Sequence, residues 1–226
     1  GAAAVAERAL RAGVDGLCVA LAAEGVALRD AGVDAPILVL SEQPREQIGE
    51  MIAHRLTPTA YTPGYVDAWF GALGKRAAAP SFPIHVKVDT GMQRVGVDAD
   101  SAAALVARVA ALTPTLRLEG VYTHLACADE PDAHGNAEQL ARFDTVLGDL
   151  ASIGITPALV HAANSAGALA LPDSRHSLVR AGIAIYGIEP GAGVADRCTA
   201  FRPVMTLAAR VSFVQRVAPG ERISYG

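Results

Sequence analysis

The chain has 226 residues, of which 51% are hydrophobic and 19% charged, and its formal net charge is -4 at pH 7. This length suits one large domain, or a large domain with the start of another. No run approaches the roughly 18 apolar residues that span a bilayer, which argues against a membrane protein. The acidic charge and scattered basic residues argue against a nucleic-acid partner. Three cysteines without a CxxC pair argue against a disulfide framework and a structural zinc site, and favour a soluble protein of the reducing cytoplasm.

Two patterns alternate along the chain. Apolar residues spaced three and four apart predict helices over residues 2–11, 23–31, 101–111 and 137–151. Short continuous apolar runs predict strands buried on both faces of a parallel sheet, at residues 16–20, 36–40, 56–60, 84–89, 118–123, 158–162 and 178–186. Repeated units of this kind are typical of a (β/α) barrel or a doubly wound sheet.

The number of predicted strands and the residue pattern near the end of the chain define the expected domains. Seven strands are predicted where a closed barrel has about eight, and the first of them follows a helix. We therefore expect an α/β fold, a (β/α)8 TIM-type barrel lacking its first strand, over residues 1–190. Residues 202–216 alternate in the way of an antiparallel strand, so residues 200–226 are expected to begin a C-terminal β domain, also truncated.

The segment HVKVDTGMQRVG, residues 85–96, carries Lys87, Asp89 and Arg94 at the end of a predicted strand and in the loop after it. This end of a strand is the catalytic face of a barrel. Arginine presents a planar fork of donors that matches a carboxylate or a phenolate. A salt-bridged loop is the commoner explanation of such residues. Lys87 is harder to explain in that way, because a charge inside a buried strand needs a partner or a modification.

Thr123 and His124 end the next strand, in GVYTHLA. A lone histidine at such a position is more often structural than catalytic, but His124 lies at a position that matches the loop after the neighbouring strand. Four other histidines have no candidate residue at a matching position on a neighbouring strand and are interpreted as structural: His54, His134, His161 and His176.

A phosphate site is predicted near the end of the barrel. Asn164 and Ser165 follow a strand and open a short helix, where capping is their usual role but where phosphate also binds. The next predicted strand carries Arg180, Gly182 and Ile183, and a glycine inside a strand often marks the close approach of a ligand. Because the loops after strands seven and eight form the usual phosphate site of this fold, a phosphorylated substrate or cofactor is expected.

Several motifs, taken in order, resemble the signature blocks of the alanine racemase family. VKVDTGMQRVGV is close to the family's DTGMxR signature, and THLACAD, HAANSAGAL and VRAGIAIYGIEP resemble the three blocks that follow it. The first forty residues are similar to the segment after the family's lysine motif, and FRPVMTLAARVSFVQRVAPGERISYG resembles the start of its β domain. The resemblance covers essentially the whole chain.

The resemblance implies a (β/α)8 barrel followed by a β domain, a homodimer, and the interconversion of L- and D-alanine for cell-wall peptidoglycan, with pyridoxal 5'-phosphate as cofactor. It implies that Arg94 holds the substrate carboxylate and the cofactor's phenolic oxygen. Lys87, often carbamylated in the family, would hold Arg94 in place. Arg180 would face the pyridine nitrogen, with His124 supporting it.

The same resemblance assigns the phosphate to Ser165 and to the backbone amides of Gly182 and Ile183, with Asn164 beside them. Gln93 stands where the family most commonly has glycine, a departure that changes neither arginine.

Neither of the family's two proton-transferring bases is matched in this sequence. One is a lysine in a K-A-x-x-Y-G-H-G motif, of which Gly1 would be the last glycine, and the other is a tyrosine in a G-Y-A-D-G block expected after Gly226. The chain alone is therefore expected to be inactive. Alternatives are a racemase of serine, lysine or a broad set of amino acids, an inert fragment, and a non-catalytic binder of the cofactor, against which the segment after Phe201 argues.

Overall fold

The computed structural model describes residues 1–74 and 81–225, in which seven strands, all paired in parallel, alternate with helices. Six of them follow one another in barrel order: β1 (Leu17–Val19), β2 (Ile37–Val39), β3 (Thr59–Ala60), β4 (Phe82–Asp89), β6 (Leu116–Tyr122) and β7 (Leu159–His161). The first two form one sheet and the other four belong to a second. Each strand pairs with the next along the chain, except that β2 and β3 are joined only by a bridge between Leu38 and Thr57. This chain-order pairing is the arrangement of a barrel rather than of a doubly wound sheet.

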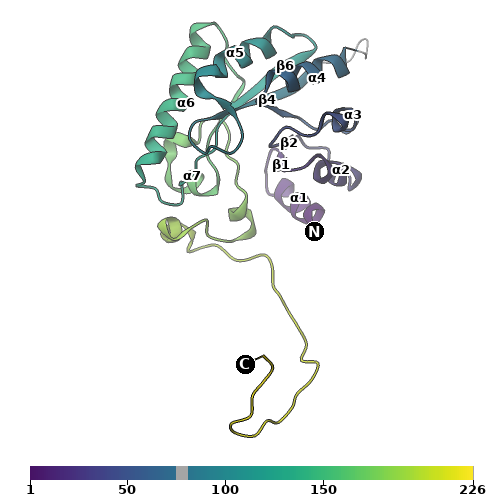
Figure 1. Cartoon of the computed structure of the whole chain (residues 1–226), viewed down its shortest axis with the longest axis vertical. Coiled ribbons are helices and arrows are strands. Elements are labelled where there is room, and N and C mark those ends of the chain that lie inside the picture. Colours follow the sequence, from purple (N-terminus) through teal and green to yellow (C-terminus); the bar gives the residue numbers. More distant parts are fainter. Residues whose placement is uncertain (75–80, 226) are drawn as a thin grey trace.

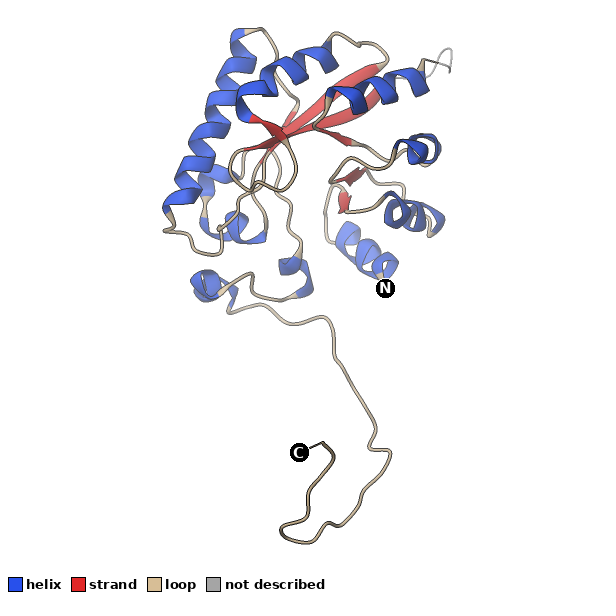
Figure 2. Ribbon diagram, in the orientation of Figure 1, coloured by secondary structure: helices blue, strands red, loops and turns tan. Residues whose placement is uncertain are grey.

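The helices lie around the outside of the strands (Figures 1 and 2). They are α1 (Ala2–Arg11), α2 (Ala22–Asp30), α3 (Ile48–Ala53), α4 (Pro63–Leu73), α5 (Ala99–Ala110), α6 (His134–Ser152) and α7 (Ser165–Ala170). The four helices predicted from periodicity are confirmed to within three residues at either end. The short strand β5 (Val97–Asp98) and the helices α3 and α4 were not predicted.

Alternation along β4 separates the apolar core from the barrel interior. Ile84, Val86 and Val88 belong to the buried cluster that the strands share with the helices. Because successive side chains of a strand point to opposite faces, His85 and Lys87 point the other way, into the interior. Both side chains are nonetheless buried, with 3% and 4% exposed. The barrel interior of this protein is therefore polar at β4.

The prediction of a strand at residues 178–186 is wrong. Residues 178–182 form no strand, and Ile183–Tyr186 is a 3-10 helix, η3. Gly182 lies at φ −100° and ψ −86°, outside the extended region, so the chain turns there. In place of a strand ladder, a single backbone hydrogen bond joins this segment to the loop after β7, from Arg180 N to Ala163 O at 3.0 Å.

The segment after Phe201 does not form the predicted antiparallel strand. Residues 203–225 contain no helix or strand, and Figures 1 and 2 show them running away from the barrel. A strand needs a hydrogen-bonded neighbour, and the described residues supply none here. The domain boundary near residue 190 stays a prediction.

Candidate functional site

Three side chains from adjacent strands form one layer inside the barrel. Lys87 of β4 is in register with Tyr122 of β6, and Tyr122 is in register with His161 of β7. The Tyr122 and His161 rings stack, with centroids 4.5 Å apart and planes 9° apart. The Lys87 ammonium lies 5.8 Å from the centre of the Tyr122 ring. The layer therefore places a cation beside the Tyr122 ring, in a buried position.

Arg180 lies against this layer and is held by a set of hydrogen bonds. Its Nη1 donates to Nδ1 of His161 at 2.5 Å, and its Nη2 donates to the carbonyls of Thr123 and Ala162 at 2.7 and 3.0 Å. The guanidinium also lies 4.9 Å from the centre of the Tyr122 ring. Burial lowers the pKa of Arg180, whose side chain is fixed in the interior at the carboxyl ends of the strands.

His124 follows β6 and contacts the same arginine. Nη2 of Arg180 lies 3.3 Å from Nδ1 of His124. Burial, and then the charges of Arg180, Lys87 and Arg94, lower the pKa of His124 to about 4. The imidazole is therefore neutral at pH 7 and accepts a hydrogen bond at Nδ1.

The loop after β4 brings Arg94 near the layer. The Asp89 carboxylate accepts from the backbone N–H of Gly91 and of Gln93, at 2.9 and 3.0 Å, which fixes the start of the loop. Gln93 adopts φ 53°, a left-handed conformation that favours glycine. Arg94, which follows it, is exposed. The structure thus gives a backbone reason why glycine is the commonest residue at position 93 in the family that the motif resembles.

The positive charges of Arg94 and Arg180 repel that of Lys87. Burial, followed by the charges of Arg94 and Arg180, lowers the pKa of Lys87 to about 8. The described residues give the Lys87 ammonium no ion-pair partner within 4.0 Å. The Asp89 carboxylate opposes this lowering of the Lys87 pKa and is the weakest of the four influences. The excess of positive charge around Lys87 favours an anionic ligand there.

Some of the residues predicted to bind a phosphate contact one another in the structure. Asn164 caps α7 by accepting from Gly167 N at 2.9 Å. The Ser165 hydroxyl accepts from Gly182 N at 2.9 Å and from Ala184 N at 3.3 Å, which joins the start of α7 to the start of η3. Ile183 is the first residue of η3 and adjoins this contact in the chain, with an exposed side chain.

Sequence reasoning missed three residues of the interior. His161 was interpreted as structural, yet it bonds Arg180 directly; Tyr122 and His85 were not singled out. The sequence did contain a signal for His85 and Tyr122, because residues two apart on a strand share one face. His85 therefore lies on the same face of its strand as Lys87, and Tyr122 on the same face as Gly120. His161 has no such local signal, since its partner arises from a distant part of the chain.

Gln139 of α6 also escaped notice, although it joins the loops that follow β4 and β6. Its Nε2 donates to Thr90 Oγ1 at 3.3 Å and to the His124 carbonyl at 3.0 Å, while its Oε1 accepts from Ala126 N at 2.8 Å. This buried amide therefore fixes the backbone that carries His124.

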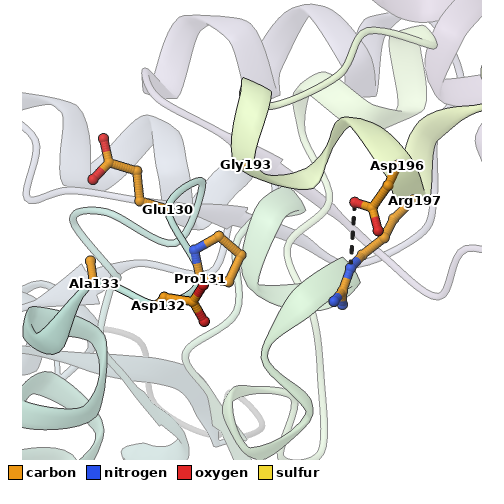
Figure 3. Close-up of a pocket in the computed structure, with 7 residues that line it drawn as sticks. All are labelled: Glu130, Pro131, Asp132, Ala133, Gly193, Asp196 and Arg197. Atoms are coloured by element: carbon orange, nitrogen blue, oxygen red, sulfur yellow. Dashed lines mark ion pairs between the residues drawn. The ribbon is translucent and has the colours of Figure 1, made fainter.

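Figure 3 shows the residues that line a cavity of about 500 Å³. It is lined by Glu130, Pro131, Asp132, Ala133, Gly193, Asp196 and Arg197. None of the candidate residues lines it, and its acidic side chains do not suit a phosphate or carboxylate ligand.

Comparisons with known proteins agree with this architecture. The sequence profile described as "Alanine racemase, N-terminal domain" matches residues 1–190. An alanine racemase of Sorangium cellulosum is 38% identical over 229 residues, and one of Desulfosudis oleivorans is 40% identical over 231 residues. They align with 100% and 98% of this chain respectively.

A solved alanine racemase structure from Clostridium difficile 630 superposes with a TM-score of 0.85 over 90% of this chain, at 32% identity. The chain spans 59%, 58% and 56% of the lengths of these three proteins. The expected α/β barrel class is confirmed by these matches and by the parallel, chain-ordered strands. This chain belongs to the alanine racemase N-terminal domain family.

Proposed function

We propose that this chain is the cofactor-binding part of an alanine racemase, which interconverts L- and D-alanine for peptidoglycan precursors with pyridoxal 5'-phosphate. The observation that carries the proposal is the cation set Lys87, Arg94 and Arg180 at the carboxyl ends of the strands. Two residues beyond Arg180, Gly182 contacts the Ser165 hydroxyl. Two anionic groups, a phosphate and an amino-acid carboxylate, would satisfy such a site.

The phosphate donors fit this cofactor. Ser165 Oγ and Gly182 N lie within 2.9 Å of each other, and a Cβ added at Gly182 would meet no atom within 4 Å. Open space therefore adjoins the Ser165 hydroxyl. The hydroxyl oxygen accepts from Gly182 N, so its own proton remains to be donated to a phosphate.

The arginine also fits. Of the five N–H groups of Arg180, the contacts above engage one on Nη1 and both on Nη2, which leaves one on Nη1 and that on Nε for an acceptor such as a pyridine nitrogen. Pyridoxal phosphate, when bound, withdraws electrons from the α-carbon of an amino acid. Because an arginine stays a donor, Arg180 would keep a proton off a nitrogen that it faces, weaken that withdrawal, and favour racemisation over transamination.

Lys87 and Arg94 would bind the substrate. Arg94 can hold a carboxylate with two parallel hydrogen bonds. A lysine whose pKa is about 8 is partly neutral near pH 7.5, as it must be to take up carbon dioxide and become a carbamate. The carbamate would turn the Lys87 side chain into an anion that pairs with Arg94. His124, neutral at pH 7, would support Arg180 without adding charge.

We further propose a homodimer in the cytoplasm. Exposed apolar side chains after residue 203 support an assembly, because such stretches are usually covered by other protein; they are Val204, Met205, Leu207, Val211, Phe213 and Val214. No helix in the described part of the chain is long and apolar enough to cross a bilayer. No residue of this chain is assigned the role of a proton-transferring base.

The proposal is tested with a chimera in which these 226 residues replace the aligned segment of the Sorangium cellulosum relative. We expect the chimera to bind pyridoxal phosphate and to convert L-alanine into D-alanine. Arg94→Ala should lower kcat/KM by about 100-fold or more, since it removes a charged bidentate contact. Arg108→Ala is the matched control, because Arg108 makes an exposed pair with Asp67.

A folded chimera that binds the cofactor but racemises another amino acid would assign a different substrate. A folded chimera that binds the cofactor without racemising any amino acid would point to cofactor binding alone. Failure of a folded chimera to bind the cofactor would overturn the proposal.

A further inference from the structure

Behind Arg180, a row of hydrogen bonds crosses the barrel interior. Nδ1 of His161 accepts from Arg180, Nε2 of His161 lies 3.0 Å from Nδ1 of His85, and Nε2 of His85 lies 3.3 Å from Oε2 of Glu119. The row runs from the carboxyl ends of the strands to a cavity of about 210 Å³, which Glu119 lines together with Arg29, Arg55 and Thr57.

The two ends of the row fix the direction of every bond in it. A guanidinium has donors only, so Nδ1 of His161 must be the acceptor and its proton must lie on Nε2. That proton is donated to Nδ1 of His85, whose own proton therefore lies on Nε2 and is donated to Glu119. A carboxylate accepts only, so both ends demand the same direction. Any other placement of the two ring protons would set two donors or two acceptors face to face.

The fold contains two departures from regular sheet geometry that build this row. Ile84 pairs with Leu118 and His85 with Gly120, so Glu119 is the extra residue of a β-bulge in β6. Bulges redirect side chains and are frequent beside active sites. Gly120 then makes room for the ring, because a Cβ added there would lie 2.4 Å from Nδ1 of His85. Without the bulge and the glycine, Glu119 and His85 could not meet in this way.

We infer that Glu119 and His85 are positioning residues, which act through the tautomer of His161 to hold the Arg180 guanidinium in one orientation. His161 contacts Arg180 directly, and Glu119 anchors the far end of the row, where its other oxygen accepts from Arg117 at 2.9 Å. The inference rests on the proposed function only for what Arg180 faces. The ring tautomers exist without any ligand, so they can be measured whether or not the cofactor proposal holds.

The first experiment is ¹⁵N NMR of the histidine rings in the unmodified 226-residue chain, without ligand. Single histidine-to-glutamine variants at the four positions outside the row assign their own resonances and leave those of His85 and His161 by elimination; the four positions are 54, 124, 134 and 176. We expect both His85 and His161 to carry the proton on Nε2 and a bare, pyridine-type Nδ1. A proton on Nδ1 of either ring would overturn the inference, and this measurement needs no variant in the row to fold.

The second experiment removes the far anchor. Glu119→Leu deletes the acceptor, and we expect exchange of the Arg180 guanidinium protons with solvent to quicken about tenfold, the effect of losing one hydrogen bond. Glu119→Gln keeps an acceptor oxygen and should restore the slow exchange. Gly120→Ala, which pushes the His85 ring away, should behave like Glu119→Leu.

Arg117→Gln is the matched control, because it removes the other partner of Glu119 but no member of the row. It should leave the ring tautomers and the guanidinium exchange unchanged. If Glu119→Leu is folded and also leaves both unchanged, Glu119 has no positioning role.

Discussion

Arg180 donates to Nδ1 of His161 at 2.5 Å, and this contact joins a segment without regular secondary structure to the strand β7. The arginine is held from one side by a ring and from the other by two backbone carbonyls. Its planar fork of donors makes all three contacts at once, which a single ammonium could not do.

We therefore expect Arg180→Lys to lower the free energy of unfolding by about 2–4 kcal/mol, since buried acceptors lose their donors. Urea unfolding at pH 7 measures this change. Arg11→Lys is the control, because Arg11 makes an exposed pair with Glu7 and its replacement should change the free energy by less than about 0.5 kcal/mol. Equal effects of the two substitutions would show that the buried contacts contribute nothing.

Lys87 should make stability depend on pH. Its pKa is about 8 in the folded chain and 10.5 as the reference value, so the unfolded chain binds more protons between those values. The free energy of unfolding should therefore rise with pH from about 8 to about 10.5.

Lys87→Met removes the buried charge and should stabilise the fold at pH 7 by about 1–3 kcal/mol. The part of the pH dependence due to Lys87 should vanish in the same variant. Urea unfolding at a series of pH values measures both effects. A variant less stable than the parent at pH 7 would mean that the Lys87 ammonium has a stabilising partner.

Ser165→Ala should affect both stability and phosphate binding. It leaves the N–H groups of Gly182 and Ala184 without their acceptor, at a cost of about 1–2 kcal/mol in the free energy of unfolding. Binding of pyridoxal phosphate, followed by calorimetry, should weaken about tenfold.

Ser152→Ala is the matched control for Ser165→Ala. The Ser152 hydroxyl makes an exposed hydrogen bond to Asp149 at the end of α6. Its loss should change stability by less than about 0.5 kcal/mol and leave binding intact. If Ser165→Ala binds as tightly as this control, the hydroxyl does not contact the phosphate.

Gln93→Gly should stabilise the chain. The left-handed φ of 53° strains a glutamine, and glycine adopts it freely. Glycine also has more freedom to lose on folding, so the net gain should be about 0.5–1 kcal/mol in thermal unfolding. Gln47→Gly is a suitable contrast, because Gln47 has φ −83° and glycine there should destabilise. A loss of stability in Gln93→Gly would mean that the glutamine side chain makes a compensating contact.

Much of the fold could be predicted because the deciding signals are local. Periodic apolar residues located α1, α2, α5 and α6, and apolar runs located the six strands β1, β2, β3, β4, β6 and β7. The start of α4 had a readable signal as well, since Thr62 accepts from Tyr65 N and Pro63 occupies the first helical position.

The errors have physical causes that the sequence does not display locally. An apolar run such as residues 178–186 fits a strand or a short helix equally well, and the turn at Gly182 decided between them. The contact of His161 with Arg180 could not be foreseen for a different reason. That contact depends on Arg180, which lies 19 residues further along the chain. The assigned roles of Arg94, Lys87, Ser165 and the other site residues stay predictions.

The contacts that build the interior layer also bear on how the chain folds. The Tyr122 hydroxyl donates to the Leu40 carbonyl across 82 residues, and His85 meets His161 across 76. Contacts between such distant segments close large loops and form late, after helices have gathered locally. During refolding, recovery of the helical signal should therefore precede recovery of the ability to bind ligand. A half-folded chain would be largely helical and yet have no binding site at all.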